Sequence, residues 1–342
     1  MDRNTVILRD TDVFMRGELD NVTISDGRIV LDLVQGSYVP YGCYTSAPLP
    51  MPAFDALRVS WNADAPDQTA VEVQARVMVD GNWTTWVSFG KWSRFLRRES
   101  PAPQDKGCLQ RRPDVLLLDS KVGQQAQIRI YLYTKSDRLT PAVSLLCVSV
   151  RTQDGIPAGG RPINTRLHLL PYAAARRAPA LRPWMDIACS LAALTNRWGA
   201  DLLPEELAQI VRDWRTDDTD THNLCFAAAA AAAWGFPAWV CYGNLALLRD
   251  EARHGFGAVV ALQATPAEIA AGLPERRFAA VRGFTAVNST PQVLLCDPCA
   301  AENDFETETA MPLDSFMVAW DNVALLMRPQ PNGAHRAPRT RT

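Results

Sequence analysis

The hydrophobic positions in the first part of the chain repeat every second residue. In residues 71–79 apolar side chains alternate with polar ones, and the turn sequence 80–82 (Asp-Gly-Asn) follows. This pattern predicts a strand with one buried face. Similar runs at 127–134 and 142–151 predict further strands. Short strands between clusters of Gly, Pro, Asp and Asn predict an all-β sandwich or jelly roll over residues 1–151.

The pattern changes after a stretch rich in Gly and Pro, residues 152–165, which we interpret as a linker. Apolar residues then recur at helical spacing, and short apolar runs follow. Helices are expected at 189–198, 204–214, 224–234 and 245–253, and strands at 257–262, 278–284, 292–297 and 323–327. Helices followed by strands predict an α+β domain over 166–328. The tail 329–342 has three prolines and no acidic residue, and we expect it to be disordered.

Composition narrows the class of protein. The 342 residues are 47% hydrophobic and 21% charged, with a net charge of −2, so neither a nucleic-acid partner nor an anionic membrane surface is indicated. No apolar run reaches the roughly 20 residues of a membrane-spanning helix. The N-terminus has no signal-peptide pattern, so we expect a cytoplasmic protein, or a secreted one if a leader has been removed. The eight cysteines are too few for a disulfide scaffold in a chain of this length.

Metal and cofactor motifs are weak. Cys296 and Cys299 form a single C-x-x-C pair, but a structural zinc site usually needs a second pair. The acidic stretch 217–222 lacks the glycine and the distal glutamate of an EF-hand loop. The sequence has neither a phosphate-binding loop nor a G-x-S-x-G motif. We therefore expect no cofactor and no metal.

A thiol at the start of a helix is a candidate nucleophile, because a helix N-terminus and an imidazole together stabilise a thiolate. The stretch 182–199, RPWMDIACSLAALTNRWG, contains Cys189. The chain has four histidines, at positions 168, 222, 254 and 335, and none follows this helix at the start of a strand. An active thiol hydrolase using Cys189 with His222 or His254 stays open, although a surface or capping histidine is the simpler interpretation of each.

The second half resembles the papain-like cysteine peptidases that process double-glycine bacteriocin leaders. LLPYAAA (169–175) is similar to the family's V-P-x-x-S-Q strand, and DIACSLAALTNRWG (186–199) is similar to its nucleophile helix. RRFAAVRGF (276–284) resembles G-H-L-V-V-V-R-G-F, and CDPCA (296–300) resembles N-D-P-A-A. SWNADAP and CVSVR in the first half resemble the extra N-terminal β-sandwich of bacterial members. The resemblance implies a papain-like fold for 166–328.

The resemblance also implies that the catalytic groups have been replaced. Asp186 stands at the family's nucleophile position, Arg277 at its histidine and Ala175 at its oxyanion glutamine. Asp297 matches the residue that orients the histidine. An arginine is no base near neutral pH, and alanine offers an oxyanion no side-chain donor. We therefore expect no catalytic residue and a degenerate site formed by Ala175, Asp186, Arg277 and Asp297.

Three functions follow from the sequence. The first is a pseudo-peptidase that binds a peptide or protein partner in the former cleft or acts as a structural module. The second is a thiol peptidase or hydrolase using Cys189. The third is ligand binding by the β-sandwich, for which exposed aromatic residues from among Trp83, Trp86 and Trp92 would be needed. The oligomeric state is not predicted.

For the degenerate site we predict a charged cluster in place of the catalytic groups. Asp186 would cap the Cys189 helix, because aspartate oxygens accept free backbone N–H groups there. Its carboxylate would also pair with Arg277. Asp297 would pair with the same guanidinium, whose five donors can serve two carboxylates.

Overall fold

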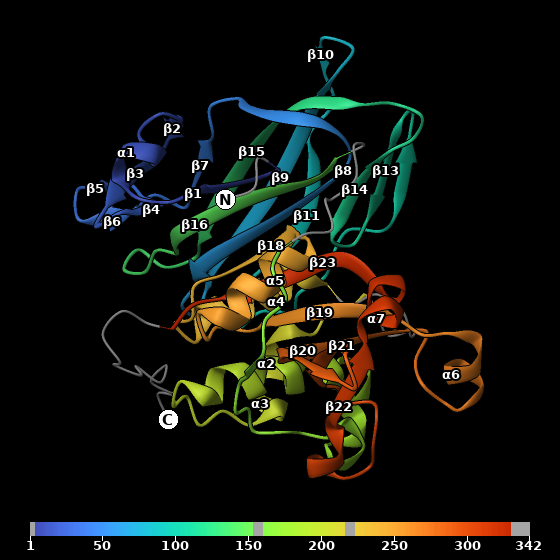
Figure 1. Cartoon of the computed structure of the whole chain (residues 1–342). Coiled ribbons are helices and arrows are strands. Elements are labelled where there is room, and N and C mark those ends of the chain that lie inside the picture. Colours follow the sequence, from blue (N-terminus) through green and yellow to red (C-terminus); the bar gives the residue numbers. More distant parts are fainter. Residues whose placement is uncertain (1–3, 153–159, 216–222, 330–342) are drawn as a thin grey trace.

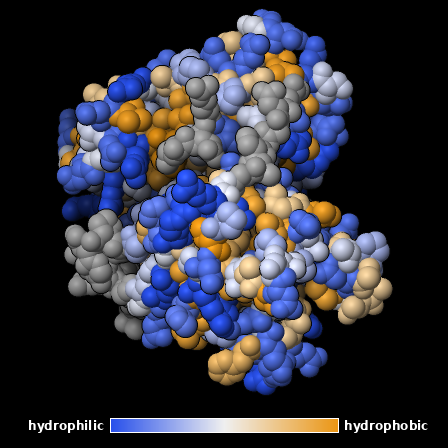
Figure 2. Space-filling view, in the orientation of Figure 1, coloured by the Kyte–Doolittle hydropathy of each residue, from blue (hydrophilic) through white to orange (hydrophobic). Residues whose placement is uncertain are grey.

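The computed structural model describes residues 4–152, 160–215 and 223–329, and most of its regular structure is β. Fourteen strands form one sheet and seven form another, and these two sheets lie in the upper and lower parts of Figure 1. The surface narrows between the two parts (Figure 2). All strands of the first sheet come from residues 5–152, and all strands of the second come from residues 165–327. No strand is therefore shared between the two sheets of the described residues.

The first sheet folds into two layers that share a long strand. The first residues of β8 (Leu49–Asp64) pair with β15, and its later residues pair with β16. One layer contains β2 (Glu18–Asp20), β7 (Tyr41–Thr45), β9 (Thr69–Val79), β10 (Asn82–Trp83), β11 (Val87–Trp92) and β15 (Gly123–Thr134). The other contains β1 (Thr5–Leu8), β3 (Val22–Ser25), β4 (Arg28–Leu31), β12 (Gln104–Lys106), β13 (Leu109–Arg112), β14 (Val115–Leu118) and β16 (Ala142–Thr152). A short helix α1 (Thr11–Phe14) and the β5–β6 hairpin (Leu33–Val34, Ser37–Tyr38) lie beside them.

One hydrophobic core lies between these layers. In β9 the residues at alternate positions from Val71 to Val77 are fully buried, which is the period-two pattern expected for 71–79. They share this core with Trp61 of β8 and Val148 of β16. The predicted strands 127–134 and 142–151 correspond to β15 and β16. The alternation of apolar and polar residues therefore corresponds to strands with one buried face, and this half is β structure, as we expected.

The second sheet is antiparallel throughout, in the order β18-β23-β19-β20-β21-β22. Its strands are β17 (Thr165–Arg166), β18 (Ala238–Tyr242), β19 (Ala258–Gln263), β20 (Arg276–Val287), β21 (Thr290–Cys296), β22 (Glu308–Pro312) and β23 (Trp320–Met327). The helices are α2 (Met185–Arg197), α3 (Pro204–Val211), α4 (Leu224–Ala233), α5 (Leu245–Arg253), α6 (Pro266–Ala270) and α7 (Leu313–Ala319), with three 3₁₀ helices, η1 (Ala174–Arg176), η2 (Pro179–Trp184) and η3 (Asp304–Thr307).

Helix α4 joins the two halves. It is apolar on every side, and a helix of that kind must be buried all round. Phe226 packs edge-on against Trp61 of the first sheet, with ring centroids 6.2 Å apart. Cys225 and Ala229 belong to the same hydrophobic core as the first sheet. The helix therefore completes the core of the β half although it is encoded in the other half.

The edge strand β18 is closed by side chains of the first sheet. Its other edge pairs with β23, so the backbone groups of alternate residues face β8 and β16. The contacts are Asn62 with the backbone of Ala238 (2.6 and 3.0 Å), Val240 N with Ser60 Oγ (3.0 Å) and Tyr242 N with Ser149 Oγ (2.9 Å). All four side-chain contacts are buried, so polar residues of one sheet satisfy the open edge of the other.

Helix boundaries differ from the expected ones by a few residues. Helix α5 has the predicted bounds, but α2 begins at Met185 instead of 189 and α3 ends at Val211 instead of 214. The early start of α2 follows from η2, a proline-containing 3₁₀ turn that leads directly into it. Residues 153–159 of the linker and 330–342 of the tail lie outside the described residues. No helix in the described part of the chain is long and apolar enough to cross a membrane.

Candidate functional site

Asp186 lies in the first turn of α2, where backbone N–H groups lack partners within the helix. Trp184 occupies the N-cap position, so Asp186 is the second helical residue and not the cap that we expected. One of its carboxylate oxygens accepts from Ile187 N (2.7 Å) and the other from Phe278 N of β20 (3.0 Å). The side chain is only 5% exposed. Asp186 therefore fastens the start of α2 to strand β20.

Arg277 lies next to that contact on β20 and is 2% exposed. Its Nε donates to Asp297 (2.7 Å), and one Nη donates to Glu268 (3.1 Å). The Asp297–Arg277 pair is the one predicted from the sequence. The second carboxylate that Arg277 binds is Glu268, and the expected Asp186–Arg277 pair stays a prediction.

Ala175 lies in the short helix η1. The backbone of this helix is hydrogen-bonded to the loop after Asp297. Ala174 N donates to Pro298 O (2.9 Å), and Ala173 N donates to a carboxylate oxygen of Asp304 (2.7 Å). The four positions of the predicted degenerate site thus converge, although they span more than 120 positions of the sequence. Ala175 is exposed, and the other three are buried.

The electrostatics of this site favour ion pairs over proton transfer. Burial alone would lower the pKa of Arg277, but Asp297 and Glu268 outweigh it and raise that pKa. The pKa of Glu268 is lowered, chiefly by the Thr265 backbone N–H and with help from Arg277. Arg277 therefore keeps its charge at every physiological pH. A guanidinium held in this way cannot accept a proton.

The two cysteines near the site are not activated. Cys189 is 1% exposed and lies in the hydrophobic core, and burial raises its pKa well above the ordinary value for a thiol. Cys299 is half-buried, and its pKa is also raised, first by burial and then by Asp186 and Asp297. A reactive thiol needs a lowered pKa and access to solvent. Neither thiol meets both requirements.

The histidines do not supply a base in the described part of the chain. His168 is exposed and follows strand β17 by two residues. His254 ends α5 with 59% of its side chain exposed, and a ring nitrogen lies 2.9 Å from Asp250 O. His222 and His335, like the acidic stretch 217–222, lie outside the described residues. Cys296 is the last residue of β21, and Cys299 lies in the loop that follows.

Glu268 is the one member of the charged site that sequence reasoning missed. It is held by a capping box at the start of α6, in which Thr265 Oγ accepts from Glu268 N and Thr265 N donates to Glu268 (2.7 Å). The sequence Thr265-Pro-Ala-Glu268 is a signature of such a box. The motif could have predicted the helix, but nothing local shows that its glutamate reaches Arg277.

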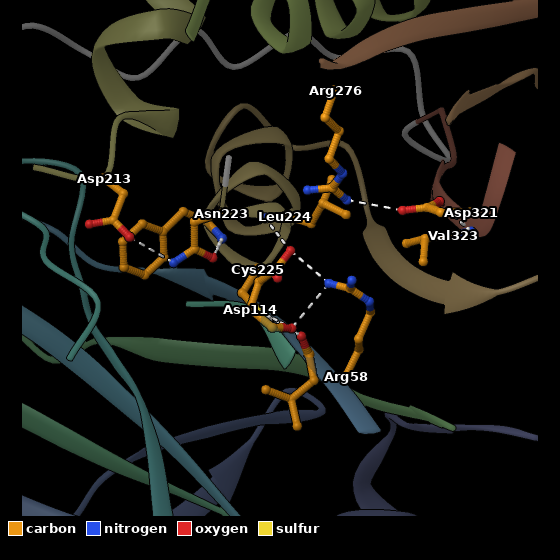
Figure 3. Close-up of polar contacts among 11 residues, drawn as sticks. Arg58, Asp114, Asp213, Asn223, Leu224, Cys225, Arg276, Asp321 and Val323 are labelled. Carbon is orange, nitrogen blue, oxygen red and sulfur yellow. Dashed lines mark hydrogen bonds and ion pairs between the residues drawn. The ribbon is translucent and has the colours of Figure 1, made fainter. Parts of the chain in front are cut away.

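A second buried arginine lies between the two halves of the molecule (Figure 3). Arg58 of β8 pairs with Asp114 at 2.7 Å, and both side chains are less than a tenth exposed. Asp114 also accepts from Leu224 N at the start of α4 (3.3 Å). Asn223 caps the same helix by accepting from Phe226 N (3.2 Å), and its amide donates to Asp213 (3.1 Å). Charges from both halves therefore fix the first turn of α4.

The tryptophans of the first sheet divide into two kinds. Trp92 is fully buried, as the core interpretation expects. Trp83 and Trp86 are half-buried, and the guanidinium of Arg76 lies 4.7 and 4.6 Å from their ring centroids. The guanidinium of Arg129 lies 4.2 Å from the centroid of the Trp86 ring. These residues form a row of stacked aromatic and arginine side chains on the outer face of β9 and β15.

A family model and solved structures are similar to parts of this chain. Residues 8–150 match the family model described as the Peptidase C39 N-terminal domain. The peptidase domain of Streptococcus ComA, a bifunctional ABC transporter of a quorum-sensing pathway, is 17% identical, covers 49% of this chain and all of that one, and has a TM-score of 0.35. A family two carbohydrate esterase from Cellvibrio japonicus is 14% identical over 55% of this chain and 50% of its own, with a TM-score of 0.21. No curated protein matches.

Proposed function

We propose that this chain, which is related to the C39 peptidases, is a catalytically silent member whose former catalytic cluster holds the fold together. One observation carries the proposal: Arg277, which the sequence resemblance aligns with the family's catalytic histidine, is bound by two carboxylates. On this proposal the chain consists of a β-sandwich domain, residues 1–151, and a papain-like domain, residues 166–328. Its role is to bind a peptide or protein partner or to act as a structural module.

The chemistry of each position supports this proposal. Both carboxylate oxygens of Asp186 accept hydrogen bonds from the backbone, which reduces what nucleophilicity a carboxylate has. Cys189, the alternative nucleophile, lies inside the core with a raised pKa. Nucleophilic catalysis on a peptide needs an activated nucleophile with a base in hydrogen-bond reach. Neither Asp186 nor Cys189 meets both requirements among the described residues.

The first test is hydrolysis by the full chain of a quenched fluorescent peptide with a Gly-Gly pair before the scissile bond. We expect no cleavage above the buffer rate, and the same rate for the Cys189→Ala variant. We also expect iodoacetamide to label Cys189 far more slowly in the folded protein than in urea. Cleavage that is lost in Cys189→Ala, together with fast labelling of Cys189, would favour a thiol hydrolase instead.

The second test asks whether the site binds without cutting. Fluorescence polarisation of the same peptide, with a scrambled-sequence peptide as control, should show saturable binding. Two matched variants separate the role of the nucleophile from that of the base: Asp186→Cys alone, and Asp186→Cys combined with Arg277→His. The first should remain inactive because it has a thiol and no base. Equal binding of the scrambled peptide would leave the structural-module version of the proposal and remove the peptide-binding one.

A second candidate function rests on the row formed by Trp83, Arg76, Trp86 and Arg129. Half-buried tryptophans on a sheet face stack on apolar faces of ligands, and the neighbouring guanidinium groups bind hydroxyl or carboxylate oxygens. Trp86→Ala should lower the affinity for a ligand bound on this face. Trp92→Phe, a change in the core, should not. Tryptophan fluorescence during titration with oligosaccharides measures both.

A further inference from the structure

A cavity of about 310 Å³ lies in the second half, away from the charged site. Its wall comes from the residues before β17, from the β20–β21 hairpin and from the start of α7. The apolar part includes Ile163, Phe284 and Leu313, and the polar part includes Gln292 and Thr285. The volume is at the lower end of the roughly 300–1,000 Å³ that is typical of small-molecule pockets. It suits a small organic molecule and not a folded partner.

Arg249 of α5 is the one charged residue in this wall. It is 7% exposed. One Nη donates to Gly160 O (2.7 Å), and Nε is buried with no hydrogen-bond partner. No other hydrogen bond from its guanidinium is found among the described residues. Nε is closed off from the cavity, whereas the second Nη has no hydrogen bond among the described residues and can still take one.

Arg249 also lacks a carboxylate partner within the described part of the chain. Its two acidic neighbours are engaged elsewhere: Asp250 pairs with Arg253 (3.2 Å), and Glu251 pairs with Arg328 (2.6 Å). Burial lowers the pKa of Arg249, and no acid among the described residues counteracts this. An arginine pKa is normally far above 7, so the group stays charged. A charge that is buried without compensation is costly and rare outside functional positions.

We propose that this cavity binds a small organic carboxylate with an apolar body. The carboxylate would bind the second Nη of Arg249, because a guanidinium N–H forms a strong hydrogen bond with a charged oxygen. The apolar body would lie against Phe284, Ile163 and Leu313, while Gln292 and Thr285 offer further hydrogen bonds at the rim. This site shares no residue with the charged site, so it does not depend on the proposed function.

The test uses the full chain and sodium octanoate as the probe, measured by isothermal titration calorimetry. Octanamide has the same body without the charge, and inorganic phosphate has the charge without the body. We expect octanoate to bind, and each of the other two to bind roughly 10- to 150-fold more weakly, since a hydrogen bond to a charged group contributes that much. Arg249→Met should lose octanoate binding by a similar factor. Arg253→Met, on the exposed side of the same helix, should bind it like the wild type.

Any of four results would overturn the proposal. They are no octanoate binding by the wild type, equal binding by octanamide, equal binding by phosphate, and equal binding by Arg249→Met. If Arg249→Met does not fold, phenylglyoxal labelling of the wild type followed by mass spectrometry gives an independent answer. Octanoate should protect Arg249 and leave Arg253 labelled. Labelling of Arg249 that octanoate does not change would also overturn the proposal.

Discussion

Arg277 and Arg249 are both buried arginines in the second half of the chain, but their surroundings differ completely. Arg277 binds Asp297 and Glu268, and its pKa is raised. Arg249 binds one backbone carbonyl, has no acidic partner among the described residues, and has a lowered pKa. Among the described residues, the same buried side chain thus has carboxylate partners at one site and none at the other.

This difference separates two uses of a buried charge. A guanidinium that binds two carboxylates of its own chain holds those segments together. A guanidinium with an open edge is held ready for an anion from outside. Arg58, which binds the single carboxylate of Asp114, lies between these cases. Four substitutions test whether the number of carboxylates decides the role.

The largest effect is expected from Arg277→Met. The substitution leaves Asp297 buried without its counter-ion, and removing one partner of a buried pair costs about 3–5 kcal/mol. Urea denaturation followed by circular dichroism measures the loss of unfolding free energy. The double variant Arg277→Met with Asp297→Asn is the control and should recover part of the loss. No recovery would mean that Arg277 acts through its packing alone.

Arg58→Met should cost about 3 kcal/mol, at the lower end of the same range, because Asp114 then loses its counter-ion but keeps the Leu224 N–H. Because the pair joins both halves at the start of α4, the loss should affect both halves in one cooperative transition. Near-ultraviolet and far-ultraviolet circular dichroism during denaturation should therefore report the same midpoint. Two separate midpoints would contradict this.

Glu268→Gln should cost about 0.5–1 kcal/mol at pH 7, since a partly exposed ion pair contributes in that range. The pKa of Glu268 is lowered in the folded state, so its contribution is present above its unfolded pKa of about 4.3 and is lost as the pH falls through the lower folded value. The difference in melting temperature between variant and wild type should therefore shrink below about pH 4. A difference that grows with acidity would refute the assignment.

Arg249→Met should have the smallest effect on stability, within about 1 kcal/mol of zero in either direction, because the lost hydrogen bond is offset by removing an uncompensated charge. Thermal denaturation without added ligand measures it, with Arg253→Met as the matched control. A loss near that of Arg277→Met would place Arg249 among the structural arginines. That result would remove the distinction drawn between the two sites.

The sequence predicted where helices and strands occur better than it predicted which of them pair or pack together. The alternation in residues 71–79 identified a strand because each position depends only on which face is buried. The division of β8 between two layers, by contrast, depends on partners far along the chain, and no local pattern indicates it. Likewise, α4 reads as an apolar helix, but nothing in its ten residues says that it packs on the other half.

The candidate site shows the same division. The resemblance located Asp186, Arg277 and Asp297, and it implied that they lie together as the family's catalytic residues do. The partner choice within the cluster was not predictable: Asp186 binds backbone N–H groups, and Glu268 reaches Arg277 from α6. Arg249 was not singled out because its isolation appears only when its neighbours Asp250 and Glu251 are seen to bind elsewhere.

Strand β18 has a consequence for how the chain can be divided. Its outer edge is satisfied by Asn62, Ser60 and Ser149, all from the first sheet. A fragment starting near residue 160 would expose that edge and the apolar surface of α4 together. Open strand edges recruit other strands, and this is a common route to aggregation. The first sheet therefore protects the open edge of the second sheet from other strands. We expect neither half to fold properly when it is expressed alone or fused to another protein.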